Sequence, residues 1–575
     1  MPDLTQSLQG RDLGHLKIIA ELWGIEFSAP DARVGLQRII PLLLNEKAVN
    51  ECLALLPEGA RAALGELTRN EGRVPWAAFE RRYGVVREMG AARRDREKPY
   101  LDAHASAAEA LWYRGLIGKN FFDTPSGPQE FAYIPDDLLP FIPIVDVHRK
   151  SPMGRLATPA EKSYLILAND HILDDACTFL AALRSGEREK GLARRPGEAS
   201  SYFLVANPFL PYPLTLDAFQ ILLVEAQLLD ERGAPQPDAV RRFLEAERGE
   251  ALLWLTRAWL RSPVFNDLLH IPHLAAEGEW KNDPLRARSA ILDYLSTISG
   301  VLDGEVHVTE QPFWSLGSLV NDVRQSEADF LRSAGEYDSW YIRDLRSGNY
   351  LRGFEHWDHV EGELIRFMIG GPLYWLGVVD LGLPAAPEVG ETPLVTSFRF
   401  SRLAQGLLNL SAPGELEQEG DRFQAAISGR LRIPILTKRS IRYQTARFTE
   451  WEGIVQDCYQ YRITPKSLSG AQKQGLRVAQ LKGLLLRHAQ PTPPKLIQAL
   501  EHWEAEGSMA RVDQLLVLRV KQPELLDQLR KTRLARYLGE ALSPTAIVVR
   551  RGSLEKLLDG LVEMGYFGEV GVLDE

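Results

Sequence analysis

The sequence predicts a helix-rich α+β protein that is divided into several domains, and three observations support this class. The chain has 575 residues, which is too long for one hydrophobic core and predicts roughly three to five domains. Apolar residues recur at three- and four-residue spacing through much of the chain, as in amphipathic helices. The hydrophobic content of 45% and the twelve Trp are those of a folded globular protein.

Two domains are expected at the N-terminus. Residues 1–56 form a helical cap, because "LGHLKIIAELWGI" and "VGLQRIIPLLL" place apolar residues at helical spacing on either side of the polar turn "SAPDAR". Residues 57–143 contain three helical segments, the last capped by Ser106, and then "KNFFDT" and "EFAYI", two aromatic stretches joined by a Pro/Gly turn. Three helices that end in a two-stranded hairpin indicate a winged helix.

The middle of the chain repeats this order less clearly. Residues 150–283 form a helical region, with apolar positions at helical spacing in "TLDAFQILLVEAQLL". From residue 284, three helical segments lead into "PLYWLGVVDLG" and "TSFRFSRL", which have the composition of strands. We therefore expect a second winged-helix-like unit over residues 284–402.

Charge is distributed unevenly along the chain. Residues 430–500 contain thirteen Lys and Arg against three Asp and Glu, so this segment carries +10 and the rest of the chain −20. Residues 461–500 contain no acidic residue. A local positive field on an acidic body favours a polyanion or an acidic protein surface as the partner. The alternative is a solvated basic helical surface without a partner.

The basic segment is predicted to be an α/β module in two parts. In residues 420–508, strand-like and helix-like segments alternate, and Thr464-Pro465 and Thr492-Pro493 are expected helix starts, with Thr as the cap. Residues 509–575 alternate strand and helix again, and we expect a small α/β unit that belongs to the same module.

The order of several segments in this module resembles a known family. The segments are "RIPIL", "YRITPKSLSGAQKQG", "TPPKLIQAL", "VDQLLVLRVKQPELL" and "LSPTAIVVRRGSLEKLLDGLVEMGYF". Between about residues 430 and 567 they resemble the XPB-type helicase N-terminal domain, which also occurs in bacterial helicase-associated proteins. A related module on the XPB partner subunit of TFIIH pairs with the copy on the helicase. The resemblance thus implies a clutch-like module that docks on a superfamily 2 helicase.

The sequence offers little chemistry of its own. It contains no G-x-x-x-x-G-K-[ST] phosphate loop, and "GLIGKN" at residues 115–120 is the nearest approach, so ATP hydrolysis of the helicase type is not expected. "FEHWDHVEGE" offers His356, Asp358, His359 and Glu361 but lacks the H-E-x-x-H spacing, and a polar helix face is favoured over a zinc site. The three Cys are far apart, without a C-x-x-C pair. We expect no enzyme activity, cofactor, metal or small-molecule substrate.

The sequence also predicts a cytoplasmic protein that does not enter a membrane. The N-terminal residues "MPDLTQSLQGRD" lack a basic-then-apolar signal pattern. The longest apolar run, "MIGGPLYWLGVV" at residues 368–379, is far shorter than a membrane span.

Two classes of function compete. The first is a non-enzymatic accessory factor that docks on an XPB-like helicase and contacts DNA in unwinding or repair. The second is a DNA-binding transcription regulator whose winged helices read an operator directly. Cations near the first winged helix fit either class, because phosphate contacts position a protein without specifying sequence, and a solvated loop remains the other interpretation.

Two groups of basic residues are the predicted sites. The predicted DNA-binding residues are Arg81, Arg82, Arg87, Arg93, Arg94, Arg96 and Lys98. The predicted residues for docking a partner or DNA are Lys438, Arg439, Arg442, Arg447, Lys466, Lys473, Arg477 and Lys482.

Overall fold

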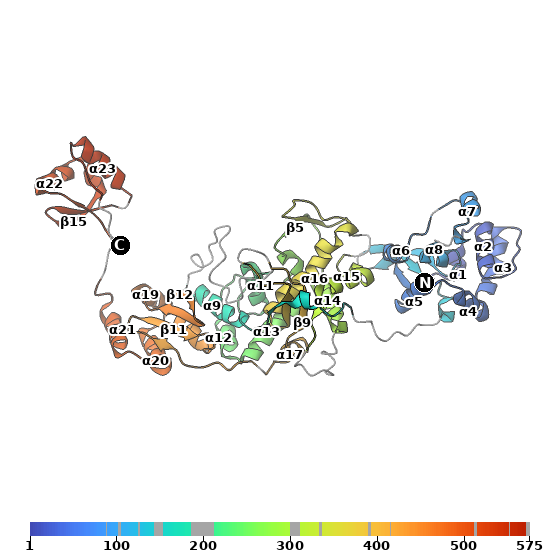
Figure 1. Ribbon diagram of the computed structural model, residues 1–575, viewed down its shortest axis with the longest axis horizontal. Coiled ribbons are helices and arrows are strands. Elements are labelled where there is room, and N and C mark those ends of the chain that lie inside the picture. The colour runs from blue at the N-terminus through green and yellow to red at the C-terminus, as the bar shows by residue number, and fades with distance from the viewer. Residues whose placement is uncertain are drawn as a thin grey trace. The chain divides into compact units, whose positions relative to one another are not determined.

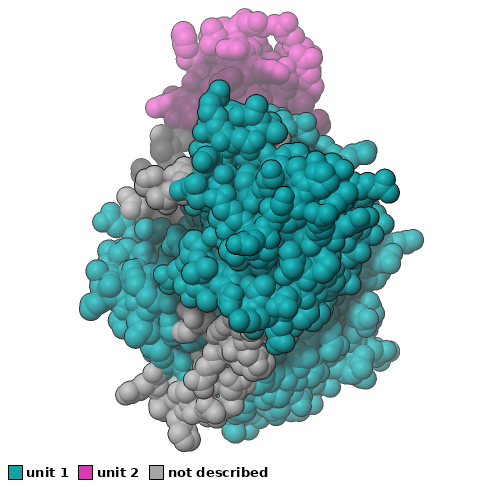
Figure 2. Space-filling view, turned by 90° about the vertical axis from the view of Figure 1, so that its right-hand side faces the viewer, with its two compact units in different colours: residues 1–492 teal, residues 493–575 magenta. Residues whose placement is uncertain are grey.

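A computed structural model shows the chain as two compact units, residues 1–492 and residues 493–575, which are teal and magenta in Figure 2. The fold is mixed α+β and rich in helices, with several small antiparallel sheets (Figure 1), and this confirms the predicted helix-rich α+β class. The structure describes residues 1–87, 89–101, 105–124, 127–142, 153–185, 212–298, 311–332, 336–388, 393–414, 416–510, 515–550 and 552–570.

Residues 1–142 have a hydrophobic core of their own, to which both the predicted cap and the segment after it contribute. The helices are α1 (Leu4–Leu8), α2 (Leu13–Leu22), α3 (Ala32–Leu43), α4 (Glu46–Ala54), α5 (Glu58–Arg69), α6 (Trp76–Tyr83), α7 (Ala91–Glu97) and α8 (Ala107–Trp112), with 3-10 turns at Pro99–Leu101 and Leu139–Phe141. The strands are β1 (Arg73–Pro75), β2 (Gly118–Thr124) and β3 (Gly127–Tyr133), in the antiparallel order β1-β3-β2.

The predicted hairpin and the Ser106 cap are both present. β2 pairs with β3 from Gly118–Tyr133 to Thr124–Gly127. Ser106 Oγ accepts from the amide of Glu109 at 3.0 Å and starts α8. Asp12 starts α2 in the same way, with its carboxylate 3.0 Å from the His15 amide. Short polar side chains thus fix where these helices begin.

Residues 153–408 share one further core. The helices are α9 (Ile172–Ser185), α11 (Leu216–Glu225), α12 (Pro237–Glu245), α13 (Arg248–Arg261), α14 (Pro284–Ile298), α15 (Leu316–Ser326), α16 (Glu363–Met368) and α17 (Ala404–Leu408). π-helical turns at Asp358–Gly362 and Ile369–Leu373 flank α16, and 3-10 turns lie at Pro159–Lys162, Asp267–His270, Ala328–Phe330 and Phe354–His356.

Two antiparallel sheets belong to this core. One has the order β4-β8-β9-β6 and is built from β4 (Tyr164–Ile166), β6 (Trp314–Ser315), β8 (Val379–Leu383) and β9 (Ser397–Phe400). The other pairs β5 (Leu274–Glu277) with β7 (Tyr341–Asp344). The second winged-helix-like unit predicted for residues 284–402 does not stand apart, because its sheet includes β4 and its core continues into α9 and α11–α13.

Residues 416–492 form the first part of the basic module. A sheet of order β10-β11-β13-β12 contains β10 (Gln424–Ala425), β11 (Arg430–Pro434), β12 (Glu450–Val455) and β13 (Cys458–Arg462). The helices are α18 (Arg439–Ala446), α19 (Pro465–Lys473) and α20 (Val478–His488). Leu431 and Ile433 on β11 are buried while Arg430 and Arg432 are exposed, as alternation along a strand requires.

The first predicted Thr-Pro helix start is confirmed, whereas at the second a helix begins but the predicted Thr cap is wrong. Thr464 Oγ1 accepts from the Ser467 amide at 3.0 Å, and Pro465 is the first residue of α19. Thr492 instead donates to the Ala489 carbonyl at 2.8 Å, at the end of α20, and α21 (Pro494–Glu506) begins without a side-chain cap. The N-cap position of α21 is Pro493, whose side chain has no hydrogen-bond acceptor, so the first amides of this helix lack a side-chain partner.

Residues 493–575 contain a smaller core of their own beyond α21. The elements are β14 (Leu516–Arg519), α22 (Pro523–Lys531), a 3-10 turn at Arg533–Tyr537, β15 (Leu538–Ser543), β16 (Ala546–Val549) and α23 (Leu554–Glu563), with the antiparallel sheet order β14-β16-β15. Strand and helix alternate here as predicted. Across the described residues of both units, no helix is both long and apolar enough to cross a bilayer.

Candidate docking module

Two of the predicted docking arginines lie inside the protein. Arg439 and Arg442 on α18 are fully buried, because α18 packs against α9 and α12 of the helical region. Arg442 Nη1 donates to Thr178 Oγ1 at 2.7 Å. Arg439 Nε donates to Glu419 Oε1 at 2.9 Å, and its Nη2 donates to the Ala246 carbonyl at 2.6 Å.

A third buried arginine extends these contacts into a network. Arg248, the first residue of α13, donates from Nε to Asp170 at 2.6 Å, from Nη2 to Asp174 at 2.8 Å and from Nη1 to Glu419 at 3.0 Å. Asp174 is completely buried. Charges so far from water are stable only when they are paired. The network therefore holds the module on α9 and α13, and Arg439 and Arg442 are not open to a partner.

Burial also lowers the reactivity of groups beside this network and of one cysteine in the core of residues 1–142. The Arg442 guanidinium carbon lies 3.9 Å from the centroid of the Tyr459 ring. Burial raises the pKa of Tyr461 to about 12. It also raises the pKa of the Cys177 thiol, and that of Cys52 to about 11. These two cysteines stay protonated at neutral pH and are not nucleophiles.

The remaining predicted docking residues lie nearer the surface. Lys438, Lys466, Lys473 and Arg477 are exposed, whereas Arg447 and Lys482 are half-buried. Lys466 Nζ lies 3.2 Å from Glu450 Oε1, but its side chain is 71% exposed, so this pair adds little stability. Lys473 is the last residue of α19 and Arg477 directly precedes α20. The accessible positive charge thus follows α19 and the start of α20.

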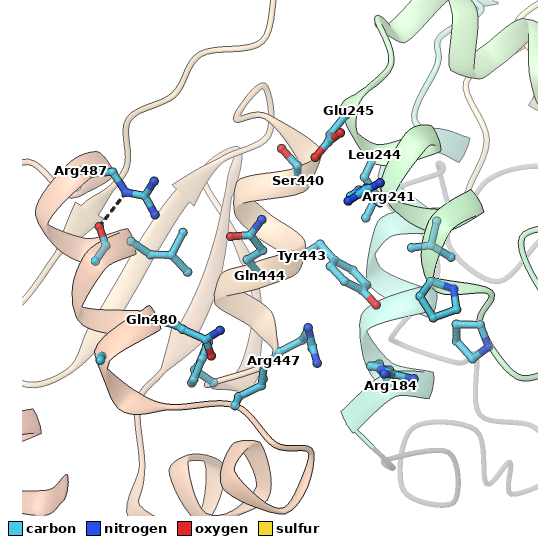
Figure 3. A pocket seen from close by; sticks show the side chains of 18 residues that line it. Arg184, Arg241, Leu244, Glu245, Ser440, Tyr443, Gln444, Arg447, Gln480 and Arg487 are labelled. Carbon is cyan, nitrogen blue, oxygen red and sulfur yellow. Dashed lines mark hydrogen bonds between the residues drawn. The ribbon is translucent and has the colours of Figure 1, made fainter.

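Arg447 lines a cleft of about 510 Å³ between α12 on one side and α18 and α20 on the other (Figure 3). Arg184, Arg241 and Arg487 line the same cleft. Of these four arginines, only Arg447 is among the docking residues that the sequence predicted. Arg184 and Arg241 lie more than two hundred residues earlier in the chain, and no local pattern joins them to the basic segment.

Arg87 and Arg94, among the residues predicted to bind DNA, have structural partners. Arg94 is buried and donates from Nη1 and Nη2 to the carboxylate of Asp12, at 2.6 and 2.8 Å. Since Asp12 caps α2, Arg94 stabilises that helix start. Arg87 donates from Nη2 and Nε to the buried carboxylate of Glu109, at 2.7 and 2.9 Å.

Arg81 and Arg82 on α6 contact residues 326–354 of the larger core. Arg81 Nη2 lies 2.6 Å from Asp329 Oδ2, and its guanidinium lies 4.3 Å from the centroid of the Phe354 ring. Arg82 pairs with Glu66 and donates to the carbonyl of Ser326. Both guanidiniums therefore have partners within the chain.

Three predicted DNA-binding residues remain accessible. Arg93 and Arg96 on α7 are 61% and 76% exposed, with the Glu97 carboxylate 2.9 and 3.7 Å away. Lys98, directly after α7, is exposed as well. These cations can reach a phosphate backbone without disturbing the core.

The His-rich segment 354–363 has a structural role. His356 and His359 have ring centroids 6.2 Å apart. Glu361 is fully buried and paired with Arg332, whose Nε donates at 2.6 Å. Within the described part of the chain, no group of three or more His, Cys, Asp or Glu could hold a metal ion.

Together these features define a mixed α+β protein in which buried ion pairs hold a basic sheet-and-helix module on a helical body. Residues 429–543 match a family model described as helicase conserved C-terminal domain. No curated protein matches the chain. The chain thus carries a helicase-related domain that begins at β11 and ends at β15. The match agrees with the helicase relationship that the sequence resemblance implied, but it does not name an XPB N-terminal domain.

Proposed function

We propose that this chain is a non-enzymatic accessory factor that docks on an XPB-like superfamily 2 helicase and contacts DNA in unwinding or repair. One observation carries the proposal: a helicase-related domain, residues 429–543, occurs in a sequence without a phosphate loop. Helicases need that loop to hold the phosphates of ATP. The motor then belongs to another polypeptide, and this chain supplies a surface that the motor binds.

The exposed cations of α19 and α20 support a docking role for the module. Lys473 and Arg477 are exposed, while Leu468, Leu481 and Leu485 of the same helices are buried. The buried pairs of Arg439 and Arg442 keep the module in one arrangement. A partner therefore meets a surface that is already ordered, and this lowers the entropic cost of association.

Residues 57–142 support contact with DNA. We interpret α5, α6, α8 and the sheet β1-β3-β2 as a winged helix. Arg93, Arg96 and Lys98 lie exposed between α6 and α8. Contacts from such residues to phosphates give affinity that does not depend on base sequence.

A capture experiment tests the proposal with a matched control. The full chain is immobilised and offered a purified XPB-like helicase, and separately a DNA duplex. We expect the double reversal Lys473→Glu/Arg477→Glu to reduce capture of the helicase. The control Lys281→Glu/Arg286→Glu makes the same charge change at exposed positions just before and within α14 and should capture as the unmodified chain does. Equal capture by all three proteins would contradict a docking role for α19 and α20.

The alternative function is a winged-helix transcription regulator, which the hairpin β2–β3 after the helices α5, α6 and α8 favours. A regulator enriches one sequence from a pool of random duplexes, because base contacts specify its site. An accessory factor that contacts only phosphates enriches no particular sequence from that pool. Enrichment of a single site by the full chain without helicase would favour the regulator.

A further inference from the structure

We propose that the cleft between α12 and the helices α18 and α20 binds a small organic phosphate monoester with an apolar body. Its volume of about 510 Å³ falls within the range of roughly 300–1,000 Å³ that is typical of small-molecule sites. The lining combines arginines with buried apolar side chains. Neither Lys473 nor Arg477 lines this cleft, and the inference does not depend on helicase docking.

Two of the four arginines that line the cleft lie together at one of its ends. Arg184, at the end of α9, and Arg447, directly after α18, lie at the same end on opposite walls (Figure 3). Among the residues that the structure describes, no carboxylate forms an ion pair with either guanidinium. Arg447 Nε is buried without a hydrogen-bond partner. Burial, together with the charge of Arg184, lowers the pKa of Arg447.

Two facing guanidiniums without a counter-charge favour a dianion between them. A buried donor that lacks a partner is costly, and an acceptor oxygen on Nε would remove that cost. Guanidinium groups bind phosphate through paired hydrogen bonds. A phosphate monoester carries close to two negative charges at neutral pH, so it offsets the repulsion between Arg184 and Arg447 better than a carboxylate does.

The middle of the cleft is apolar. Val240 and Leu244 on α12 and Leu484 on α20 are buried, and the ring of Tyr443 on α18 projects between the two walls (Figure 3). Such a lining gains free energy when it covers an apolar group, and an aromatic ring adds a stacking surface. The body of the ligand is therefore expected to be apolar and flat.

The acidic residue of the lining lies away from the proposed phosphate. Among the described lining residues, Glu245 is the only acidic one. Figure 3 shows it at the opposite end of the cleft, with Arg241 and Ser440. A carboxylate beside Arg184 would compete with the phosphate for that guanidinium. Because Glu245 lies at the far end of the cleft, it does not compete.

Calorimetric titration of the full chain with phenyl phosphate tests the inference. We expect saturable binding of phenyl phosphate, weaker binding of inorganic phosphate because it lacks the apolar body, and no binding of phenol. Arg184→Gln and Arg447→Gln should each weaken phenyl phosphate binding at least about tenfold, since each removes a charge-assisted hydrogen bond.

Arg432→Gln provides the matched control, because Arg432 is an exposed arginine on β11 outside the cleft, and it should bind phenyl phosphate as the unmodified chain does. Arg184 is exposed, so Arg184→Gln is expected to keep its fold even if Arg447→Gln does not. Absence of saturable phenyl phosphate binding by the unmodified chain would overturn the inference. Unchanged affinity in a folded Arg184→Gln protein would overturn it equally.

Discussion

Arg442 Nη2 lies 3.6 Å from Asp174 Oδ1, and both side chains are completely buried. One residue belongs to the helicase-related domain and the other to α9 of the helical region. Asp174 also accepts from Arg248 at 2.8 Å. The pair therefore anchors the first part of the domain within the larger unit, and its loss should affect stability more than any surface charge does.

Replacing Arg442 by Ala should destabilise the protein by about 3–5 kcal/mol, because one partner of a buried ion pair is left without its counter-charge. Urea unfolding measures the change. Arg432→Ala, at an exposed position of the neighbouring strand β11, should stay within about 0.5 kcal/mol of the unmodified protein. A cost below about 1 kcal/mol for Arg442→Ala would show that the network does not anchor the domain.

Replacing Arg93 and Arg96 by Gln should weaken DNA binding without loss of stability. Both side chains are mostly exposed. If both contact phosphates, the slope of log affinity against log salt should fall by up to about 1.8 on duplex DNA, about 0.9 for each contact. Binding at several salt concentrations measures this slope. An unchanged slope would assign these arginines to a solvated surface.

Arg94→Gln should have the opposite effect to the Arg93 and Arg96 replacements: it should lower stability and leave DNA binding unchanged. Arg94 is buried against Asp12, so the unfolding free energy should fall by about 1–3 kcal/mol, the value of hydrogen bonds to a charged group. The salt slope of DNA binding should stay as it is. A change in slope with intact stability would place Arg94 on the DNA instead.

His15 should make the stability of residues 1–142 depend on pH. Its ring is buried and lies 5.4 Å from that of Tyr113, and burial lowers its pKa to about 3. Between this value and the ordinary value of 6.5, the unfolded chain binds a proton that the folded chain does not. Stability is thus complete above about pH 6.5 and falls with decreasing pH, by up to about 1.4 kcal/mol per pH unit.

Urea unfolding of the unmodified chain and of His15→Phe at about pH 7.5 and about pH 5 checks this dependence. We expect the variant to lose less stability on acidification, because it cannot take up the proton. Equal losses in both proteins would mean that other groups cause the acid sensitivity.

The purified chain should not hydrolyse ATP, because its sequence lacks the phosphate loop. Phosphate release with and without DNA measures this directly. Steady DNA-stimulated turnover that persists after removal of contaminating helicases would contradict the non-enzymatic assignment.

Local sequence signals predicted local structure well. The hairpin of β2 and β3 followed from aromatic strands around a Pro/Gly turn, and the start of α19 followed from Thr464-Pro465. These features depend on neighbouring residues only. Thr492 shows the limit even here, because its hydroxyl bonds to the preceding helix and Pro493 occupies the N-cap position of α21.

Long-range contacts could not be predicted in the same way. β4 joins β8 across more than two hundred residues, and no pattern in either strand specifies that pairing. Arg439 and Arg442 have the same charge as Lys473 and Arg477, and only the packing of α18 on α9 determines which pair is buried. The cleft likewise exists only because folding brings Arg184 to Arg447.

The association rate of the full chain with a purified XPB-like helicase, measured at several salt concentrations, tests the central claim most directly. We expect fast association that slows as salt increases, because exposed charges act mainly on the encounter rate. Lys473→Glu/Arg477→Glu should associate more slowly and with less dependence on salt, whereas Lys281→Glu/Arg286→Glu should match the unmodified chain. Identical rates and salt dependence for all three proteins, or no association at all, would contradict the account.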